Sequence, residues 1–266
     1  AWEETYSLLY NKIIRGQRLH NNVPQWDAGG KIIKQSTPYE CELVYIGGNY
    51  LVYEDYNYSS SYSWGISKLD ASGNPDPSWL LTDYITSGIH SFLMQYCALT
   101  GDEMAVFYFT EYIAGLYSRY DLYVQKYNSQ GLPLWGDLGI LLYSTQFTPS
   151  RSVAGVYFGE NLFFALSEFN NAEQYYSITY NLINNNGVML WNNPESFSTE
   201  MSYRLGDFRL IPYNNDVYSI IWLSNHNENV FKINHHYVLS DGSLYYNEPV
   251  TLDQSNKGIH NLQLVN

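Results

Sequence analysis

The stretch VQKYNSQGLPLWGDLG, residues 124–139, is part of a repeat, because YNLINNNGVMLW at residues 180–191 matches it without a gap. Each stretch begins as an alternating strand, passes through a polar turn that contains a glycine, and reaches a tryptophan. Glycine can take the positive φ that a tight hairpin turn requires. The two stretches therefore predict a β-hairpin that is repeated along the chain.

The same hairpin occurs in three further places. The copies are QRLHNNVPQWDAGG at residues 17–30, SKLDASGNPDPSW at 67–79 and HYVLSDGSLYY at 236–246. An aromatic residue follows the turn in every copy, at spacings of 53, 56, 56 and 55 residues; these are Trp26, Trp79, Trp135, Trp191 and Tyr246. Aromatics at one fixed place in a repeat are typical of packing between repeats, so we predict a structural role for them.

Two more strand-like stretches precede each hairpin. In the second repeat they are CELVYI and NYLVYEDY, at residues 41–46 and 49–56. Each repeat thus holds about four strands, and no helical periodicity is visible. We predict an all-β chain, a β-propeller of five four-stranded blades, because radial closure protects the strand edges that an open sheet would expose.

The two ends of the chain are expected to share one blade. GIHNLQLVN at residues 258–266 parallels GIHSFLMQY at 88–96, which is the predicted innermost strand of the third repeat. The chain is then a single domain whose blades are 258–266 plus 1–37, 38–88, 89–147, 148–200 and 201–257. Whether it is a piece of a longer protein, and its oligomeric state, stay open.

Composition excludes several classes of protein. The 266 residues are 17% aromatic, with 28 tyrosines, which is unlike a disordered chain. We expect no membrane insertion, because no apolar run is long enough. The formal net charge of −13 disfavours nucleic acid as a partner. Cys41 and Cys97 have no metal-binding spacing, and we expect free thiols, no metal and no cofactor.

The first and third repeats resemble a known family. AWEE at the N-terminus, QRLHNNVPQWDAGG and DLYVQKYNSQGLPLWGDLG resemble the Trp/Gly-type propeller repeats of secreted or surface bacterial proteins exported by type IX-like secretion. The resemblance implies an extracytoplasmic, non-enzymatic module that belongs to a larger secretion or adhesion assembly.

The candidate binding site differs from blade to blade. Where each innermost strand begins, the aligned positions are polar, and in a propeller they surround the mouth of the central channel. We predict that this mouth binds a ligand through Tyr39, Glu40, His90, Arg151, Tyr203, Arg204 and His260. The alternative is a hydrated mouth that binds nothing.

A second repeated feature is an acid near the end of the second strand in four repeats, represented by Glu168 in the fourth. These acids either attract cations or accept backbone hydrogen bonds at the following turn, and we favour the turn. Asp70, Asn74 and Asp76 match only part of a calcium-binding loop. Whether a calcium ion binds there stays open.

From these features we predict a non-catalytic binding or scaffold module, located outside the cytoplasm, that recognises a glycan or a protein. It would use the channel mouth and the tyrosine-rich loop at residues 54–64. One alternative is a propeller glycoside hydrolase that uses Glu40 and Asp207, since such enzymes need two carboxylates on inner strands. A second alternative is a structural spacer of a larger surface protein.

Overall fold

The computed structural model describes residues 2–5, 12–17, 19–20, 23–27, 29–36, 38–45, 49–57, 61–70, 72–79, 90–100, 103–114, 117–145, 153–170, 175–191, 195–199, 204–214, 216–227 and 230–255. Within these ranges the regular structure consists of β-strands alone, which confirms the prediction of an all-β chain. A helix long and apolar enough to cross a membrane is absent from the same ranges.

The strands form five main sheets, numbered here in chain order. Sheet 1 contains β1 (Trp2–Thr5), β2 (Lys12–Gly16) and β5 (Lys31–Ser36). A separate small pair, β3 (Leu19–His20) and β4 (Val23–Pro24), comes between β2 and β5 in the chain. Sheet 2 contains β6 (Pro38–Tyr45), β7 (Asn49–Asn57) and β8 (Ser61–Leu69).

Sheets 3 to 5 have four strands each. Sheet 3 contains β9 (His90–Thr100), β10 (Glu103–Ala114), β11 (Tyr117–Tyr127) and β12 (Ile140–Thr145). Sheet 4 contains β13 (Val153–Phe158), β14 (Asn161–Asn170), β15 (Tyr175–Ile183) and β16 (Glu195–Ser198). Sheet 5 contains β17 (Arg204–Asn214), β18 (Val217–Asn227), β19 (Val230–Leu239) and β20 (Val250–Ser255). Strands that follow one another in the chain pair antiparallel, so each sheet is a simple meander.

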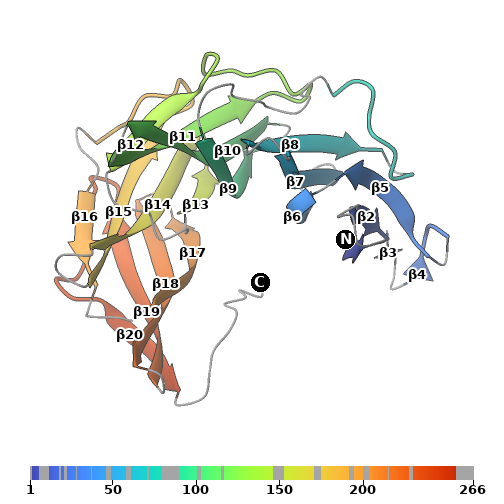
Figure 1. Ribbon diagram of the computed structural model, residues 1–266. Coiled ribbons are helices and arrows are strands. Elements are labelled where there is room, and N and C mark those ends of the chain that lie inside the picture. The colour runs from blue at the N-terminus through green and yellow to red at the C-terminus, as the bar shows by residue number, and fades with distance from the viewer. Residues whose placement is uncertain are drawn as a thin grey trace.

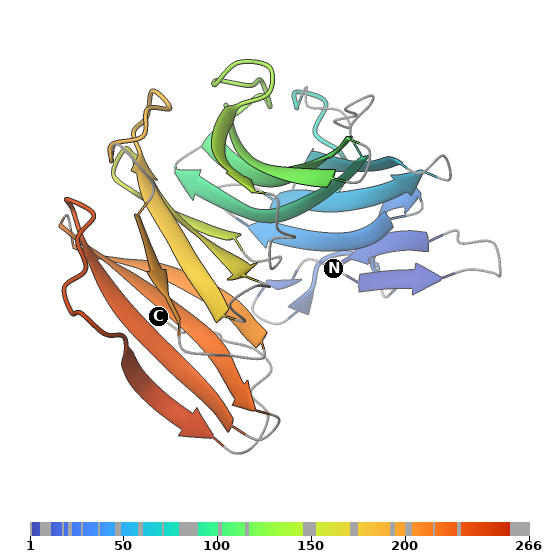
Figure 2. The ribbon, with the colours of Figure 1, turned by 60° about the vertical axis from the view of Figure 1, so that its left-hand side comes forward.

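The sheets follow one another along an arc (Figure 1). Each presents its first strand to the concave side, and β13 contacts the first strands of both flanking sheets, β9 and β17. The turned view shows neighbouring sheets stacked face on face (Figure 2).

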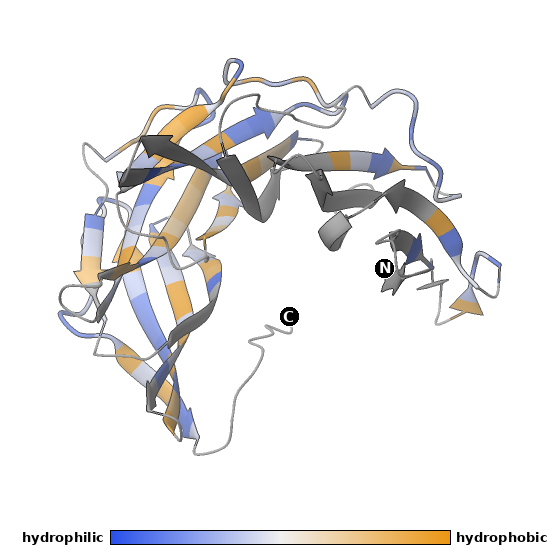
Figure 3. Cartoon of the chain, in the orientation of Figure 1, coloured by the Kyte–Doolittle hydropathy of each residue, from blue (hydrophilic) through white to orange (hydrophobic). Residues whose placement is uncertain are grey.

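Sheet 4 has a buried apolar surface on both faces. Leu162 and Phe164 of β14 pack toward sheet 3, while Phe163 and Ala165 of the same strand pack toward sheet 5. Successive side chains of a strand point to opposite faces, so one apolar run supplies two cores. Figure 3 shows the resulting bands of apolar and polar residues along the strands.

The repeated hairpin has nearly the same geometry in four sheets. The turn glycines Gly73, Gly131, Gly187 and Gly242 have φ values between 77° and 88°. In sheet 3, the Gly131 N–H donates to the Asn128 carbonyl at 2.9 Å, and the Gly187 N–H does the same to Asn184 in sheet 4. A side chain would be strained at such φ values, which explains why glycine recurs there.

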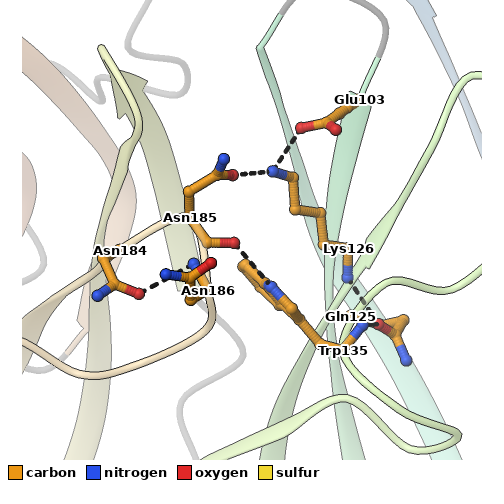
Figure 4. Close-up of polar contacts among 7 residues, drawn as sticks. All are labelled: Glu103, Gln125, Lys126, Trp135, Asn184, Asn185 and Asn186. Atoms are coloured by element: carbon orange, nitrogen blue, oxygen red, sulfur yellow. Dashed lines mark hydrogen bonds and ion pairs between the residues drawn. The ribbon is translucent and has the colours of Figure 1, made fainter.

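Lysines in the third strands connect one sheet to the next. Lys126 of β11 is buried and contacts Glu103 of its own sheet and the Asn185 side chain in the turn of sheet 4 (Figure 4). At the equivalent place in sheet 2, Lys68 donates to the Ser129 carbonyl in the turn of sheet 3 at 3.4 Å. The turns of sheets 3 and 4 thus each receive a cation from the sheet before them.

The number of blades and their boundaries stay predictions. Residues 258–266, which would complete the first blade, lie outside the described residues. Sheet 1 consequently has three main strands in the described part of the chain, with β1 at its edge.

Candidate functional site

The residues of the predicted channel mouth begin the first strands or precede them. Tyr39 and Glu40 lie in β6, His90 is the first residue of β9, and Arg204 is the first residue of β17. The side chains of these four residues are outside the described part of the structure. Three predicted residues lie outside the described residues altogether; they are Arg151, Tyr203 and His260.

A β-bulge interrupts three of the first strands near their beginning. Tyr39 is the extra residue between the pairs Pro38–Asp55 and Glu40–Glu54. In β9, Ser91 is extra between His90 and Phe92. Bulges re-aim side chains and are over-represented next to active sites.

The third bulge lies in β17 and contains an acid. Leu205 pairs with Ser224 and Phe208 pairs with Trp222, so Gly206 and Asp207 together oppose one residue of β18. Asp207 and Glu40, the two acids weighed as a catalytic pair, are therefore each in or beside a bulge on a first strand.

Three of the repeated aromatics contact the turn of the next sheet. Trp135 Nε1 donates to the Asn185 carbonyl at 3.2 Å, and Trp191 Nε1 donates to the Ser240 carbonyl at 3.1 Å. The ring of Trp26 lies against Gly73.

The other two aromatics differ. Trp79 is buried, and its Nε1 donates to the Ile66 carbonyl of its own sheet at 2.8 Å. Tyr246 is 42% exposed and has ring contacts with Tyr237 and Tyr245. Tyr246 belongs to sheet 5, the last sheet in the described part of the chain.

A groove opens between sheets 3 and 4 at their outer strands. Its volume is about 380 Å³, and it is lined by Leu141, Leu142, Tyr143, Ser144, Thr179 and Ser196. The first four lining residues belong to β12, and the last two belong to β15 and β16. Residues of both sheets thus line the groove at a junction whose interior is apolar.

A tyrosine and a glutamate join the two sheets at this groove. The Tyr143 hydroxyl donates to Glu168 Oε2 at 2.5 Å, and Glu168 is only 7% exposed. Burial raises the pKa of Tyr143 well above its ordinary value, and the hydrogen bond and charge of Glu168 add to this effect. Tyr143 therefore stays protonated and remains a donor to the carboxylate.

Sequence reasoning missed this pair. Glu168 belongs to the acids repeated near the end of the second strand, but the sequence favoured a hydrogen bond from the following turn as the role of these acids. No feature of the sequence singled out Tyr143 in another repeat. A second carboxylate, Asp121, accepts a hydrogen bond from Ser144 Oγ at 2.7 Å and pairs with Arg119 at 2.8 Å.

No group of three or more His, Cys, Asp or Glu side chains able to hold a metal occurs in the described residues. Asp70 accepts N–H bonds from Ser72 and Asn74, which keeps it within its own turn. Cys41 and Cys97 lie in β6 and β9, and their side chains are outside the described part of the structure.

No protein-family model and no curated protein sequence matches this chain. It is similar to solved structures of glycoside hydrolases. The GH32 β-fructofuranosidase of Bombyx mori is 13% identical over 79% of this chain and 48% of its own, with a TM-score of 0.44. This chain therefore spans about half the length of that enzyme.

Two further structures are similar. An α-L-arabinofuranosidase of Fusarium graminearum is 10% identical over 80% of this chain and 66% of its own, with a TM-score of 0.46. The endo-arabinase of Bacteroides thetaiotaomicron is 14% identical over 84% of this chain and 76% of its own, with a TM-score of 0.39.

These comparisons correct two predictions made from the sequence. The similar structures are enzymes that cleave glycosidic bonds, which contradicts the prediction of a non-catalytic binding or scaffold module and the prediction that the chain is not an enzyme. Sequence reasoning went wrong because no catalytic motif is visible in the residues. At identities of 10–14%, the likeness assigns no substrate and no catalytic residue to this chain.

Proposed function

We propose that this chain is a glycoside hydrolase built on a five-bladed β-propeller, with Glu40 and Asp207 as its catalytic carboxylates. The observation that carries the proposal is the pair of β-bulges at the start of β6 and β17, which contain or flank these two acids. Glycoside hydrolysis requires one carboxyl group as the acid and a second as the nucleophile or base.

The propeller is supported by the repetition of one sheet. Sheets 3, 4 and 5 share the same strand order, and their first strands are neighbours on the concave side of the arc. Closure requires residues 258–266 to pair with the edge of β1 that has no neighbouring strand among the described residues, which would give sheet 1 the innermost strand that the later sheets have. The exposed aromatic Tyr246 would then face the turn of sheet 1, as Trp191 faces the turn of sheet 5.

Closure also brings the two acids to one end of the channel. In a propeller of meandering blades the first strands all run in the same direction along the axis. Glu40 and Asp207 are the third and fourth residues of β6 and β17, so they would lie at the same height. His90 and Arg204 begin β9 and β17, and they would supply hydrogen-bond donors to a sugar at the same mouth.

We further propose that the protein acts outside the cytoplasm on a glycan. The net charge of −13 suits a solvated protein, and the resemblance of the first and third repeats to secreted propeller modules supports the same location. Export by a type IX-like system is part of this proposal, and detection of the native protein outside the cytoplasm tests the location.

Hydrolysis by the purified chain tests the activity. The substrates are sucrose, arabinan, an aryl α-L-arabinofuranoside and β-1,3-galactan, and the readout is released reducing sugar or aryl alcohol. Glu40→Gln and Asp207→Asn remove one carboxylate each, while Glu160→Gln and Asp253→Asn change exposed acids in a turn and on an outer strand.

We expect hydrolysis of at least one substrate, and a loss of about 100-fold or more in kcat for each catalytic variant. The two control variants should retain the wild-type rate. Failure of the folded wild-type protein to cleave any of the four substrates, or full activity in both catalytic variants, contradicts the proposal.

A further inference from the structure

The groove between sheets 3 and 4 is remote from the proposed catalytic acids in the fold. It lies at the outer strands β12 and β16, whereas Glu40 and Asp207 lie on first strands. Its volume of about 380 Å³ falls in the range of sites for small ligands, which is roughly 300–1,000 Å³.

The tyrosine hydroxyl of the groove is arranged as an acceptor. The Tyr143 hydroxyl has one hydrogen, which is committed to Glu168, whereas Ser144, the next residue of β12, turns its hydroxyl to Asp121 of its own sheet. A hydroxyl that donates its hydrogen to a carboxylate has lone pairs left to accept from a ligand. Since Glu168 is buried in β14, the Tyr143 hydroxyl is held in a fixed orientation.

The opposite wall adds two groups of the same kind. Thr179 and Ser196 are paired residues of β15 and β16, so their side chains are neighbours on the face toward sheet 3. Leu141 is 45% exposed beside them and provides an apolar contact. A ligand that fits must donate several hydrogen bonds and must also have apolar C–H surface.

Charge restricts the ligand further. Glu168 is hydrogen-bonded to the groove residue Tyr143, and Asp121 is paired with Arg119. The protein as a whole has a net charge of −13. An anionic ligand would be repelled from this surface, whereas a neutral one would not.

We propose that this groove is a binding site for neutral saccharide chains, separate from the site of hydrolysis. Sugar rings combine hydroxyl donors with C–H faces, which is the combination that the lining residues accept. If the proposed hydrolase function holds, the site would bind a polysaccharide at the outer rim of the protein while the active site cleaves another part of the same polysaccharide.

Affinity electrophoresis in native gels tests the proposal without requiring hydrolysis. The gels contain linear arabinan or β-1,3-galactan, with polygalacturonate as the anionic counterpart. Ser196→Trp fills the groove from an exposed position, and Gln254→Trp places the same side chain on the outer strand of sheet 5 as a control. Thr179→Val removes one hydroxyl at nearly constant shape.

We expect at least one neutral polysaccharide to retard the wild-type protein and polygalacturonate to leave it unaffected. Ser196→Trp should weaken the retardation at least about 10-fold and Thr179→Val about 3- to 10-fold, as expected for one hydrogen bond. Gln254→Trp should leave it unchanged.

Two kinds of result overturn the proposal. One is the absence of retardation by both neutral polysaccharides, or equal retardation by polygalacturonate. The other is retardation that survives Ser196→Trp or disappears in Gln254→Trp, because it then arises elsewhere. The binding result is independent of the hydrolysis assay, so failure of one proposal is distinguishable from failure of the other.

Discussion

The indole of Trp191 lies against Gly242, the turn glycine of the following sheet. A Cβ atom placed on Gly242 would be 3.0 Å from Trp191 Cδ2, and Trp191 Nε1 donates to the neighbouring Ser240 carbonyl. Trp135 stands in the same relation to Gly187, and Trp26 to Gly73. An aromatic of one sheet therefore closes on the hairpin of the next, which links the repeat in the sequence to contact between sheets.

The first prediction concerns this contact. Gly242→Ala places a methyl group against Trp191 at a φ of 88°, so it combines backbone strain with steric overlap. We expect a loss of about 2–4 kcal/mol in the free energy of unfolding, measured in urea.

Gly136→Ala is the matched control, because Gly136 has a φ of 75° and no atom within 4 Å of the new methyl group. This variant should lower the free energy of unfolding by about 1–2 kcal/mol, through backbone strain alone. Equal losses in the two variants would show that Trp191 does not restrict this position.

The second prediction concerns the buried cation. Lys126 contacts Glu103 and the Asn185 side chain, and its Nζ lies 5.9 Å from the centre of the Trp135 ring (Figure 4). Lys126→Ala should lower the free energy of unfolding by about 2–4 kcal/mol, because the buried stem and both polar contacts are lost.

Lys31→Ala is the comparison, since Lys31 also reaches the next sheet, through Ser72 and Asn74, but from a half-buried position. A loss of about 1 kcal/mol or less is expected there in the same urea titration. The idea that Lys126 joins sheets 3 and 4 fails if its variant is no less stable than Lys31→Ala.

The third prediction is a dependence on pH. His236 is buried, and burial lowers its pKa below the ordinary value of 6.5. The unfolded chain then binds a proton at a higher pH than the folded chain, so stability is complete above about pH 6.5 and falls as the pH decreases below it.

His236→Phe should remove part of this decrease, because phenylalanine has no proton to bind. His235, whose pKa burial also lowers, should retain the remainder. Thermal unfolding between pH 5 and pH 8, roughly one unit or more on each side of the histidine pKa, is the measurement. Parallel curves for the variant and the wild type would refute the assignment to His236.

The fourth prediction tests the pair at the groove. Tyr143→Phe removes the hydroxyl that donates to Glu168, which is a buried carboxylate. We expect a loss of about 1–3 kcal/mol at neutral pH. The double variant with Glu168→Gln should be more stable than the sum of the single losses predicts, with a coupling of about 1 kcal/mol or more. Additive losses would mean that the two side chains act independently.

The sequence predicted the all-β class because strand alternation and turn glycines are local properties. Gly131 and Gly187 have nearly equal φ values, as their identical turns require. The contacts between sheets were harder to predict from the sequence. Alternation shows that Glu168 and Tyr143 each lie in a strand, but not that two different repeats bring them together.

The functional prediction failed for a related reason. The inner-strand acids are single residues without a surrounding motif, and the sequence alone does not show that Asp207 lies in a bulge. That feature depends on which residues of β18 pair with Leu205 and Phe208, and pairing is a property of the folded sheet.

A crystal structure of the protein would give the distance between the carboxyl groups of Glu40 and Asp207, which is the decisive test of the proposed hydrolase. We predict a distance of roughly 5–9.5 Å, the range that covers retaining and inverting glycoside hydrolases. A value near the lower end would indicate retention, and one near the upper end inversion. Carboxyl groups separated by clearly more than this range, or pointing away from a common channel, would contradict it.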